Sequence, residues 1–273
     1  MFKTGFFQFE PKFGEVEKNL AKVLSALQNV DADLIVLPEL AFTGYYFQNR
    51  RELMLMAEDP GTSRTVDELT RLCLDRNFFL VTGFAEKCAD KIFNSALLIG
   101  PRGVLGTYRK LHLFNTEKDY FDSGNTPLET IDVRGAKIGM MVCFDWVFPE
   151  VARELSLNGA DILCHPSNLV LDWCQQAMVT RCLENAVFAV TANRIGEEVR
   201  PHGELKFTGK SQVTAPKGEI VYRATPDKEE LYITEIDLDL ARNKFMTQKN
   251  DLFRDRRPEF YTSLSNPMSH SKG

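Results

Sequence analysis

The chain has 273 residues, a formal net charge of −5 and a hydrophobic fraction of 44%. This length suits one large α/β domain or two small ones, and the acidic balance offers no basic patch for nucleic acid. No apolar run is long enough to cross a bilayer, and the first five residues lack the charged and apolar regions of a signal peptide. The six cysteines show neither a C-x-x-C pair nor a zinc spacing. We therefore expect reduced, mostly structural thiols, no metal site and a cytoplasmic protein.

Strands and helices alternate through the first two thirds of the chain, which is typical of an α/β fold. A helix is predicted where apolar residues recur at three- and four-residue steps, and a strand where a short apolar run lies between turn residues. The expected strands are 6–9, 33–38, 78–84, 92–99, 103–108, 136–142 and 161–166, and the expected helices are 15–30, 63–76, 151–155 and 173–186. The last third is β-rich, with strands at 209–215, 219–223 and 230–236 and a hairpin turn at 216–218.

Two segments of the chain share one pattern. Ala32–Pro38 matches Ala160–Pro166, and each follows an amphipathic helix. Two similar helix–strand units favour two stacked sheets with helices outside. From the pattern alone, chance similarity between two buried strands is an equally good explanation.

Three polar residues follow apolar strands. Glu39 comes after 34–37, Lys110 after 106–109, and Cys143 after 136–142. Because open α/β sheets build their sites at the carboxyl ends of strands, these residues can be interpreted as a base, a cation and a nucleophile. Cys143 stands where a strand meets a helix, and the positive end of that helix favours thiolate over thiol. A buried structural thiol is the alternative for this cysteine taken alone.

These segments resemble the signatures of the nitrilase superfamily of carbon–nitrogen hydrolases. They are Leu37-Pro38-Glu39-Leu40, then Tyr108-Arg109-Lys110-Leu111-His112-Leu113-Phe114, then Val142-Cys143-Phe144-Asp145 with Phe148-Pro149-Glu150. The similarity runs from Phe6 to about Tyr261. It implies an α/β fold, a four-layer αββα sandwich of the nitrilase type. The hydrolase domain is then 1–262, followed by a disordered C-terminal tail at 263–273. The resemblance also implies a partner subunit, with part of the charged segment after Leu240 crossing to it.

An amide or nitrile carbon is a poor electrophile, so the nucleophile must be activated and the developing negative charge must be held. Cys143 is the candidate nucleophile, and Glu39 would accept and return its proton. Lys110 and the backbone N–H of Phe144 would hold the oxyanion. Glu117 matches the auxiliary glutamate of the family. We predict a thioester acyl-enzyme route that requires no metal or organic cofactor.

The predicted substrate is a small aliphatic amide or an N-carbamoyl compound. True nitrilases often carry Trp-Glu after the cysteine, whereas Phe144-Asp145 stands here, as in many amidase-like and carbamoyl-hydrolase-like members. Some aliphatic nitrilase-like members share the Phe-Asp form, so nitrile hydrolysis is the alternative. We expect Tyr45, Phe144, Trp146 and Asn168 to bind substrate, with core packing as the alternative for each.

Other functions are compatible with the same residues. His112 or His165 could pair with Cys143 as in a cysteine protease, although Glu39 offers a ready base. A non-catalytic interaction protein would have no use for three such residues on separate strand ends. An acyltransferase of the lipoprotein type would carry a membrane segment. We also expect a homodimer or higher homo-oligomer, because the 173–186 helix carries an apolar face beyond the needs of one core.

Overall fold

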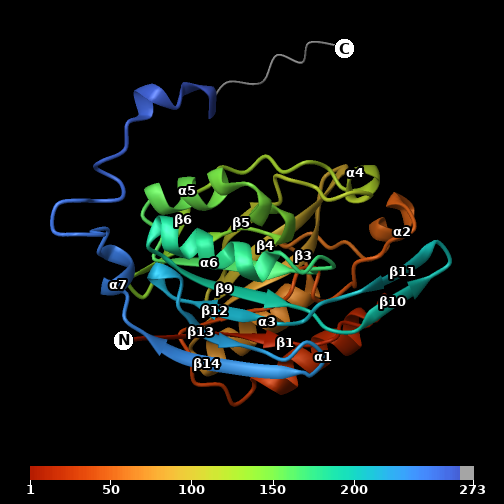
Figure 1. Cartoon of the computed structure of the whole chain (residues 1–273). Coiled ribbons are helices and arrows are strands. Elements are labelled where there is room, and N and C mark those ends of the chain that lie inside the picture. The colour runs from red at the N-terminus through yellow and green to blue at the C-terminus, as the bar shows by residue number, and fades with distance from the viewer. Residues whose placement is uncertain (265–273) are drawn as a thin grey trace, which may run out of the picture.

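The computed structural model describes residues 1–264, and two six-stranded sheets lie face to face in it (Figure 1). The first sheet has, in spatial order, β14 (Glu230–Ile236), β1 (Phe2–Gln8), β2 (Leu34–Val36), β3 (Phe79–Cys88), β4 (Lys91–Gly100) and β5 (Gly103–Arg109). The second has β13 (Ile220–Arg223), β12 (Gln212–Thr214), β9 (Phe188–Asn193), β8 (Ile162–Ser167), β7 (Ala136–Met140) and β6 (Thr130–Val133). A separate hairpin of β10 (Glu197–Arg200) and β11 (Gly203–Lys206) projects from the sandwich.

Helices cover the outer face of each sheet, which completes the four predicted layers. The α-helices are α1 (Val16–Leu27), α2 (Arg50–Met54), α3 (Arg64–Arg76), α4 (Glu117–Tyr120), α5 (Pro149–Leu157), α6 (Cys174–Asn185) and α7 (Asp239–Arg242). The 3-10 helices are η1 (Cys143–Val147), η2 (Pro216–Gly218), η3 (Pro258–Phe260) and η4 (Thr262–Leu264). Helices α1 and α3 pack on the first sheet, and α5 and α6 pack on the second. None of the helices in residues 1–264 is long and apolar enough to span a membrane.

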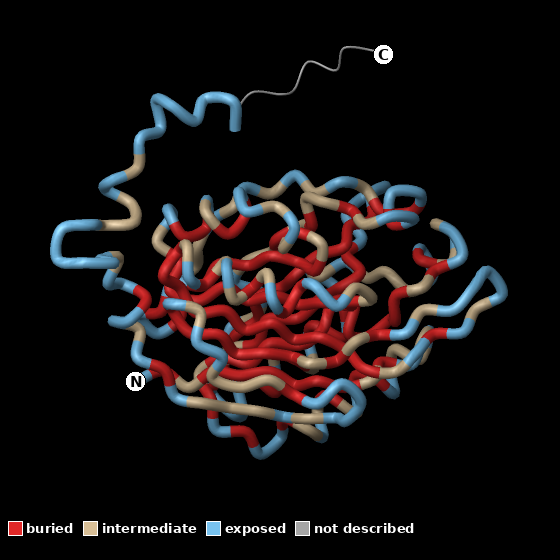
Figure 2. Tube along the Cα trace, viewed as in Figure 1, coloured by how far each residue is buried: buried red, intermediate tan, exposed pale blue. Residues whose placement is uncertain are grey.

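Alternation along β2 explains how one short strand contributes to two cores. Leu34 and Val36 belong to the cluster between the sheets, together with Ile162 of β8. Ile35 and Leu37 belong to the cluster under α1 and α3. Successive side chains of a strand point to opposite faces, so a strand covered on both faces needs a continuous apolar run. Figure 2 shows the result, with buried residues concentrated in the two sheets.

The two similar segments recognised in the sequence occupy equivalent places. β2 follows α1 and lies between parallel neighbours β1 and β3. β8 follows α5 and lies between parallel neighbours β7 and β9. The prediction of two stacked sheets with helices outside is confirmed, and the αββα fold class is that of the structure.

Strand β14 reaches the first sheet from the far end of the chain. It pairs antiparallel with the whole of β1, from Phe2 opposite Ile236 to Gln8 opposite Glu230. The approach is so close that a Cβ on Gly5 would collide with the carbonyl of Tyr232. Glycine is therefore required at this point, where the backbones of the two paired strands come closest.

Some predicted boundaries were wrong. β3 continues to Cys88 rather than ending at 84, because Glu86 is buried and accepts a hydrogen bond from Ser95 of β4 (2.6 Å). The strand predicted at 209–215 is reduced to β12. Of the predicted tail, residues 263 and 264 form the end of η4, and 265–273 lie outside the described residues. The last described residues, 254–264, lead away from the sandwich (Figure 1).

Candidate active site

Four strand ends meet at one edge of the sandwich and carry the candidate residues. In the first sheet, Glu39 lies just beyond β2 and Lys110 directly follows β5. In the second, Cys143 lies just beyond β7 and Asn168 directly follows β8. The carboxyl ends of strands are where α/β sheets place their sites, and here each of the two sheets supplies half of the set.

Lys110 links two carboxylates in a fully buried row. Its Nζ donates to Glu39 Oε1 at 2.7 Å and to Glu117 Oε1 at 2.8 Å, and none of the three side chains is more than 1% exposed. Tyr45 Oη donates to Glu117 Oε1 at 2.6 Å, and Asn94 Nδ2 donates to Glu39 Oε1 at 2.7 Å. The predicted base, cation and auxiliary acid are therefore brought into direct contact.

The charges of Lys110, Glu39 and Glu117 stabilise one another in this buried row. Burial alone would lower the pKa of Lys110, but the carboxylates of Glu117 and Glu39 outweigh it and raise that pKa well above its usual value. Burial raises the pKa of Glu117, with Lys110 opposing and Glu39 adding to the effect. Lys110 is thus a permanent cation. Among the described residues nothing pairs with the buried Glu39 Oε2, which leaves one carboxylate oxygen free to take a proton.

Cys143 lies in a sharp turn held by Asp145. Its φ of 42° is in the left-handed region, which a residue with a side chain occupies only where the surroundings impose it. Asp145 Oδ2 accepts from Val142 N at 2.9 Å and from Tyr108 Oη at 2.8 Å. Asp145 Oδ1 accepts from His112 N at 3.2 Å. The turn is therefore tied to β7 on one side and to β5 of the other sheet on the other.

The predicted activation of Cys143 by a helix start was wrong. The residues after it form the short 3-10 helix η1, and α5 begins only at Pro149, whose missing N–H suits the first helical position. Burial raises the pKa of the Cys143 thiol well above its usual value, and Glu39 adds to the increase while Lys110 opposes it. The resting side chain is consequently a neutral thiol that needs a base during attack.

Neither candidate histidine is placed as the partner of the thiol. His165 Nε2 lies 2.9 Å from the backbone carbonyl of Cys143, and its Nδ1 lies 3.1 Å from Thr191 Oγ1. Burial lowers the pKa of His165 to about 4, so the ring is neutral. His112 Nδ1 lies 2.8 Å from Asp145 Oδ1. These contacts give no support to a Cys–His dyad and make both rings supports of the turn.

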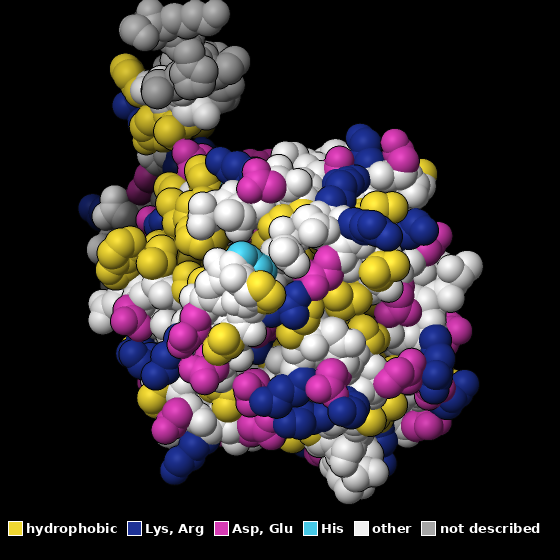
Figure 3. Space-filling model, turned by 90° about the vertical axis from the view of Figure 1, so that its right-hand side faces the viewer, with side chains coloured by type: hydrophobic (Ala, Val, Ile, Leu, Met, Phe, Trp, Pro, Cys, Tyr) yellow, Lys and Arg dark blue, Asp and Glu magenta, His cyan; other side chains and the backbone are white. Residues whose placement is uncertain are grey.

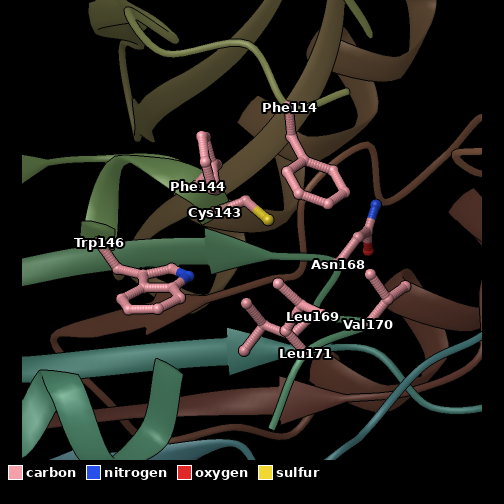
Figure 4. Close-up of a pocket in the computed structure, with 8 residues that line it drawn as sticks. All are labelled: Phe114, Cys143, Phe144, Trp146, Asn168, Leu169, Val170 and Leu171. Carbon is pink, nitrogen blue, oxygen red and sulfur yellow. The ribbon is translucent and has the colours of Figure 1, made fainter. Parts of the chain in front are cut away.

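The thiol faces a small cavity of about 20 Å³ (Figure 4). Its lining includes Cys143 itself and the polar residue Asn168, and the backbone N–H of Asn168 donates a hydrogen bond to the thiol. Neither Asn168 Oδ1 nor Nδ2 has a partner within the described residues, although the residue is only 2% exposed. In the described part of the chain no cluster of His, Cys, Asp and Glu is placed to hold a metal ion. The side chains that line the cavity are Phe114, Cys143, Phe144, Trp146, Asn168, Leu169, Val170 and Leu171.

Three of the four predicted substrate-binding residues surround the thiol. Phe144, Trp146 and Asn168 line the cavity, whereas Tyr45 is buried behind it on Glu117. Burial, together with Glu117 and Glu39, raises the pKa of Tyr45 well above its usual value, so its hydroxyl stays protonated and donates. Substrate binding by these residues stays a prediction.

Two features of the site were missed in the sequence. The first is Asn94, which donates a hydrogen bond to Glu39 and could have been noticed as an amide inside an apolar strand. The second is a buried ion pair between Arg194 and Glu198. Glu198 accepts from the backbone N–H groups of Tyr45 (3.1 Å) and Tyr46 (2.7 Å) and so fixes the loop that positions Tyr45. No local signal marks Glu198, because it stands in a charged surface-like segment.

Comparisons with known proteins agree with this architecture. The family model described as carbon-nitrogen hydrolase matches residues 3–244. The chain is 43% identical to a nitrilase of Pyrococcus abyssi, over 96% of this chain and 99% of that protein. It is 34% identical to N-carbamoylputrescine amidase of Arabidopsis thaliana, over 85% and 84% of the two chains. The crystal structure of a carbon-nitrogen hydrolase from Helicobacter pylori G27 matches with a TM-score of 0.88 at 26% identity, over 97% and 98%.

Proposed function

The chain belongs to the carbon–nitrogen hydrolase family, and we propose that it cleaves a non-peptide C–N bond in a small aliphatic amide or N-carbamoyl compound through a thioester. One observation carries this proposal: Glu39, paired with Lys110, keeps one buried oxygen free, and it lies near enough to Cys143 to raise the pKa of that thiol. Taking charged side chains out of water costs stability, so a fold with no reaction to perform has little reason to bury three of them together. A non-catalytic interaction protein on the same fold is therefore the weaker hypothesis.

In acylation, Cys143 Sγ attacks the substrate carbon while Glu39 Oε2 accepts the thiol proton. The negative charge that develops on the substrate oxygen is held by the Lys110 ammonium and the Phe144 backbone N–H. The C–N bond then breaks, and its electron pair leaves with the nitrogen. Glu39 returns the proton to that nitrogen, so ammonia or an amine departs and a thioester remains on Cys143.

In deacylation, a water molecule attacks the thioester carbon and gives a proton to Glu39. The same oxyanion donors act again. The C–S bond breaks, the acid product forms, and Cys143 recovers its proton from Glu39. Throughout the cycle Asn94 and Lys110 occupy Glu39 Oε1, which reserves Oε2 for proton transfer. Glu117 and Tyr45 position the Lys110 ammonium from the other side.

Two observations support the substrate class. The cavity is small, about 20 Å³, which is room for about one water-sized group and favours a small substrate. The names of the relatives point to amides and nitriles, since one is an N-carbamoylputrescine amidase and the other a nitrilase. Nitrile hydrolysis is the second candidate, because the nitrilase of Pyrococcus abyssi shares 43% of its residues with this chain over nearly its whole length.

A panel of amides, N-carbamoyl compounds and nitriles tests the proposal, with ammonia release as the rate and intact mass as the readout for the acyl-enzyme. We expect the added acyl mass to map to the peptide that contains Cys143. Cys143→Ala should abolish both signals, and Cys88→Ala, at an exposed cysteine, should leave both unchanged. Turnover retained by a folded Cys143→Ala protein would contradict the thioester route.

We further propose that the enzyme works as a homodimer in the cytoplasm, where its six unpaired cysteines would stay reduced. Trp173, just before α6, is 66% exposed, and Leu183 on α6 is 41% exposed, whereas Met178 is part of the core, so the free apolar face is narrower than we predicted. Phe260 and Leu264 of the segment after α7 are also exposed. Hydrophobic side chains gather on the flank below that segment (Figure 3).

Light scattering on the full chain and on a chain ending at Asp239 measures this assembly. A dimer of the full chain and a weaker dimer after truncation are expected. A monomer with full activity at micromolar concentration would refute the dimer. A dimer that truncation leaves unchanged would remove only the role of the terminal segment.

A further inference from the structure

Asn168 lines the cavity, and its buried side-chain amide has no hydrogen-bond partner among the described residues. The cavity that it lines also holds the candidate nucleophile, and Figure 4 shows the Cys143 sulfur directed toward the side of the cavity where Asn168 and Phe114 lie. A buried amide that makes no hydrogen bond destabilises a folded protein, and such groups in native structures generally have a function. Its Nδ2 can donate and its Oδ1 can accept, which complements the N–H and C=O edge of an amide or a urea.

The rest of the cavity wall is uncharged. Apart from the Cys143 and Asn168 side chains, the walls are the aromatic rings of Phe114, Phe144 and Trp146 and three aliphatic side chains. A methylene chain would lose water against such a wall and gain stability. The wall therefore suits an apolar group attached to the reacting carbon.

Two charged groups near this wall, Lys110 and Asp172, already have partners of opposite charge. Lys110 is shared between Glu39 and Glu117. Asp172, the residue after Leu171 of the wall, has its carboxylate 3.7 Å from Lys210 Nζ. None of the eight residues that line the cavity is charged, so an ammonium or carboxylate at the far end of a substrate would meet an apolar wall that offers no counter-ion, which is unfavourable.

We propose that the substrate is a neutral amide or urea whose remaining group is uncharged and apolar, and that Asn168 selects it by hydrogen-bonding the substrate beside the reacting carbon. This inference rests on the proposed function and names its substrate class. It makes Asn168 a specificity-determining residue, and it excludes diamine-derived and dicarboxylate-derived amides as good substrates.

Isosteric pairs of substrates test the charge rule. Pentanamide and 4-aminobutanamide differ by a methyl against an ammonium group, and N-pentylurea and N-carbamoylputrescine differ in the same way. Succinamate against 4-methylpentanamide tests a carboxylate. We expect kcat/KM to favour the neutral member of each pair by about 100-fold or more. Equal values, or a preference for a charged member, would overturn the charge rule.

Two variants test Asn168, with Asn29→Ala as the matched control at an exposed asparagine far from the site. Asn168→Ala should lower kcat/KM for the neutral substrates by about 10- to 100-fold. Asn168→Asp keeps the size but loses the donor and adds a negative charge, so it should lower the neutral rates and shift the ratio toward the ammonium compounds. Circular dichroism and thermal unfolding establish that each variant is folded.

The outcomes separate this inference from the proposed function. Folded Asn168 variants with kcat/KM and charge preference within twofold of the wild type would overturn the role of Asn168. If no compound in the panel releases ammonia or adds mass to Cys143, the proposed function itself fails and the inference fails with it. If neutral and charged amides are hydrolysed alike, the proposed function stands and the inference alone is refuted.

Discussion

Replacing Lys110 by methionine removes the one cation that holds two buried carboxylates, while nearly keeping the side-chain volume. Lys110 is fully buried, and its Nζ lies 2.7 Å from Glu39 Oε1 and 2.8 Å from Glu117 Oε1. The same ammonium is the candidate oxyanion donor. The variant therefore perturbs both the reaction and the fold, and the two effects can be measured separately.

The effect on the reaction follows from the loss of one charged oxyanion donor, which is typically worth about 10²–10³-fold in kcat. The effect on the fold follows from breaking a buried ion pair, which typically destabilises by about 3–5 kcal/mol. Protonation of a carboxyl relieves part of this loss. Burial already raises the pKa of Glu117, and Lys110 is what opposes the increase. Without Lys110, the pKa of Glu117 in the folded protein exceeds its unfolded value by more. The contribution of this group to stability is therefore greatest at low pH and is lost as the pH rises through the folded-state pKa.

The assay has two parts. Ammonia release gives kcat for the Lys110→Met variant, and urea unfolding at pH 5 and pH 8 gives its free energy of unfolding relative to the wild type. We expect a smaller stability deficit at pH 5 than at pH 8. Lys118→Met, at an exposed lysine next to Glu117 on α4, is the control and should change neither quantity. A folded Lys110→Met protein with kcat within tenfold of the wild type would refute the oxyanion role.

Three further predictions concern residues around the site. Asn94→Ala should lower kcat by about 10-fold or more, because Glu39 loses a hydrogen bond from a neutral donor to a charged acceptor; an unchanged kcat would contradict this. In Gly83→Ala a Cβ would collide with the backbone of Glu39, so we expect about a 10²-fold loss in kcat/KM, whereas Gly61→Ala, where a Cβ would come no closer than 3.4 Å to Asp59 Oδ1, should be neutral. For His165, whose folded pKa is about 4 against an ordinary 6.5, stability is complete above pH 6.5 and falls by about 3 kcal/mol as the pH drops to 4. Urea unfolding across this range should show that fall in the wild type and a flatter dependence in His165→Asn, and equal slopes would refute it.

The parts of the site that could be predicted from the sequence are those with a local signal. Glu39, Lys110 and Cys143 each follow an apolar run, so the carboxyl ends of strands could be located and a shared edge inferred. Asn94 could not be assigned in this way, because its contact with Glu39 depends on the register of β4 between β3 and β5. That register is set by pairing between strands and not by any single segment.

The state of the thiol shows a second limit. A helix start beside Cys143 predicts a lowered pKa, but the local argument ignores what the second sheet and the neighbouring carboxylates add. Once the sheets close, desolvation dominates and the pKa of Cys143 rises. The 3-10 turn itself depends on Asp145, which is fixed by Tyr108 from the other sheet. Electrostatics of this kind depends on packing between segments that are distant in the chain.

The pairing of β1 with β14 has a consequence for the chain while it is being synthesised. Residues 2–8 leave the ribosome early, but the strand that covers their free edge, 230–236, leaves near the end. Until then β1 presents unpaired N–H and C=O groups, which invite pairing with other chains. A nascent chain can therefore already carry Glu39, Lys110 and Cys143 while its first sheet is still open. We expect activity to appear only after residue 236 has been released, and chaperone dependence to be greatest just before that point.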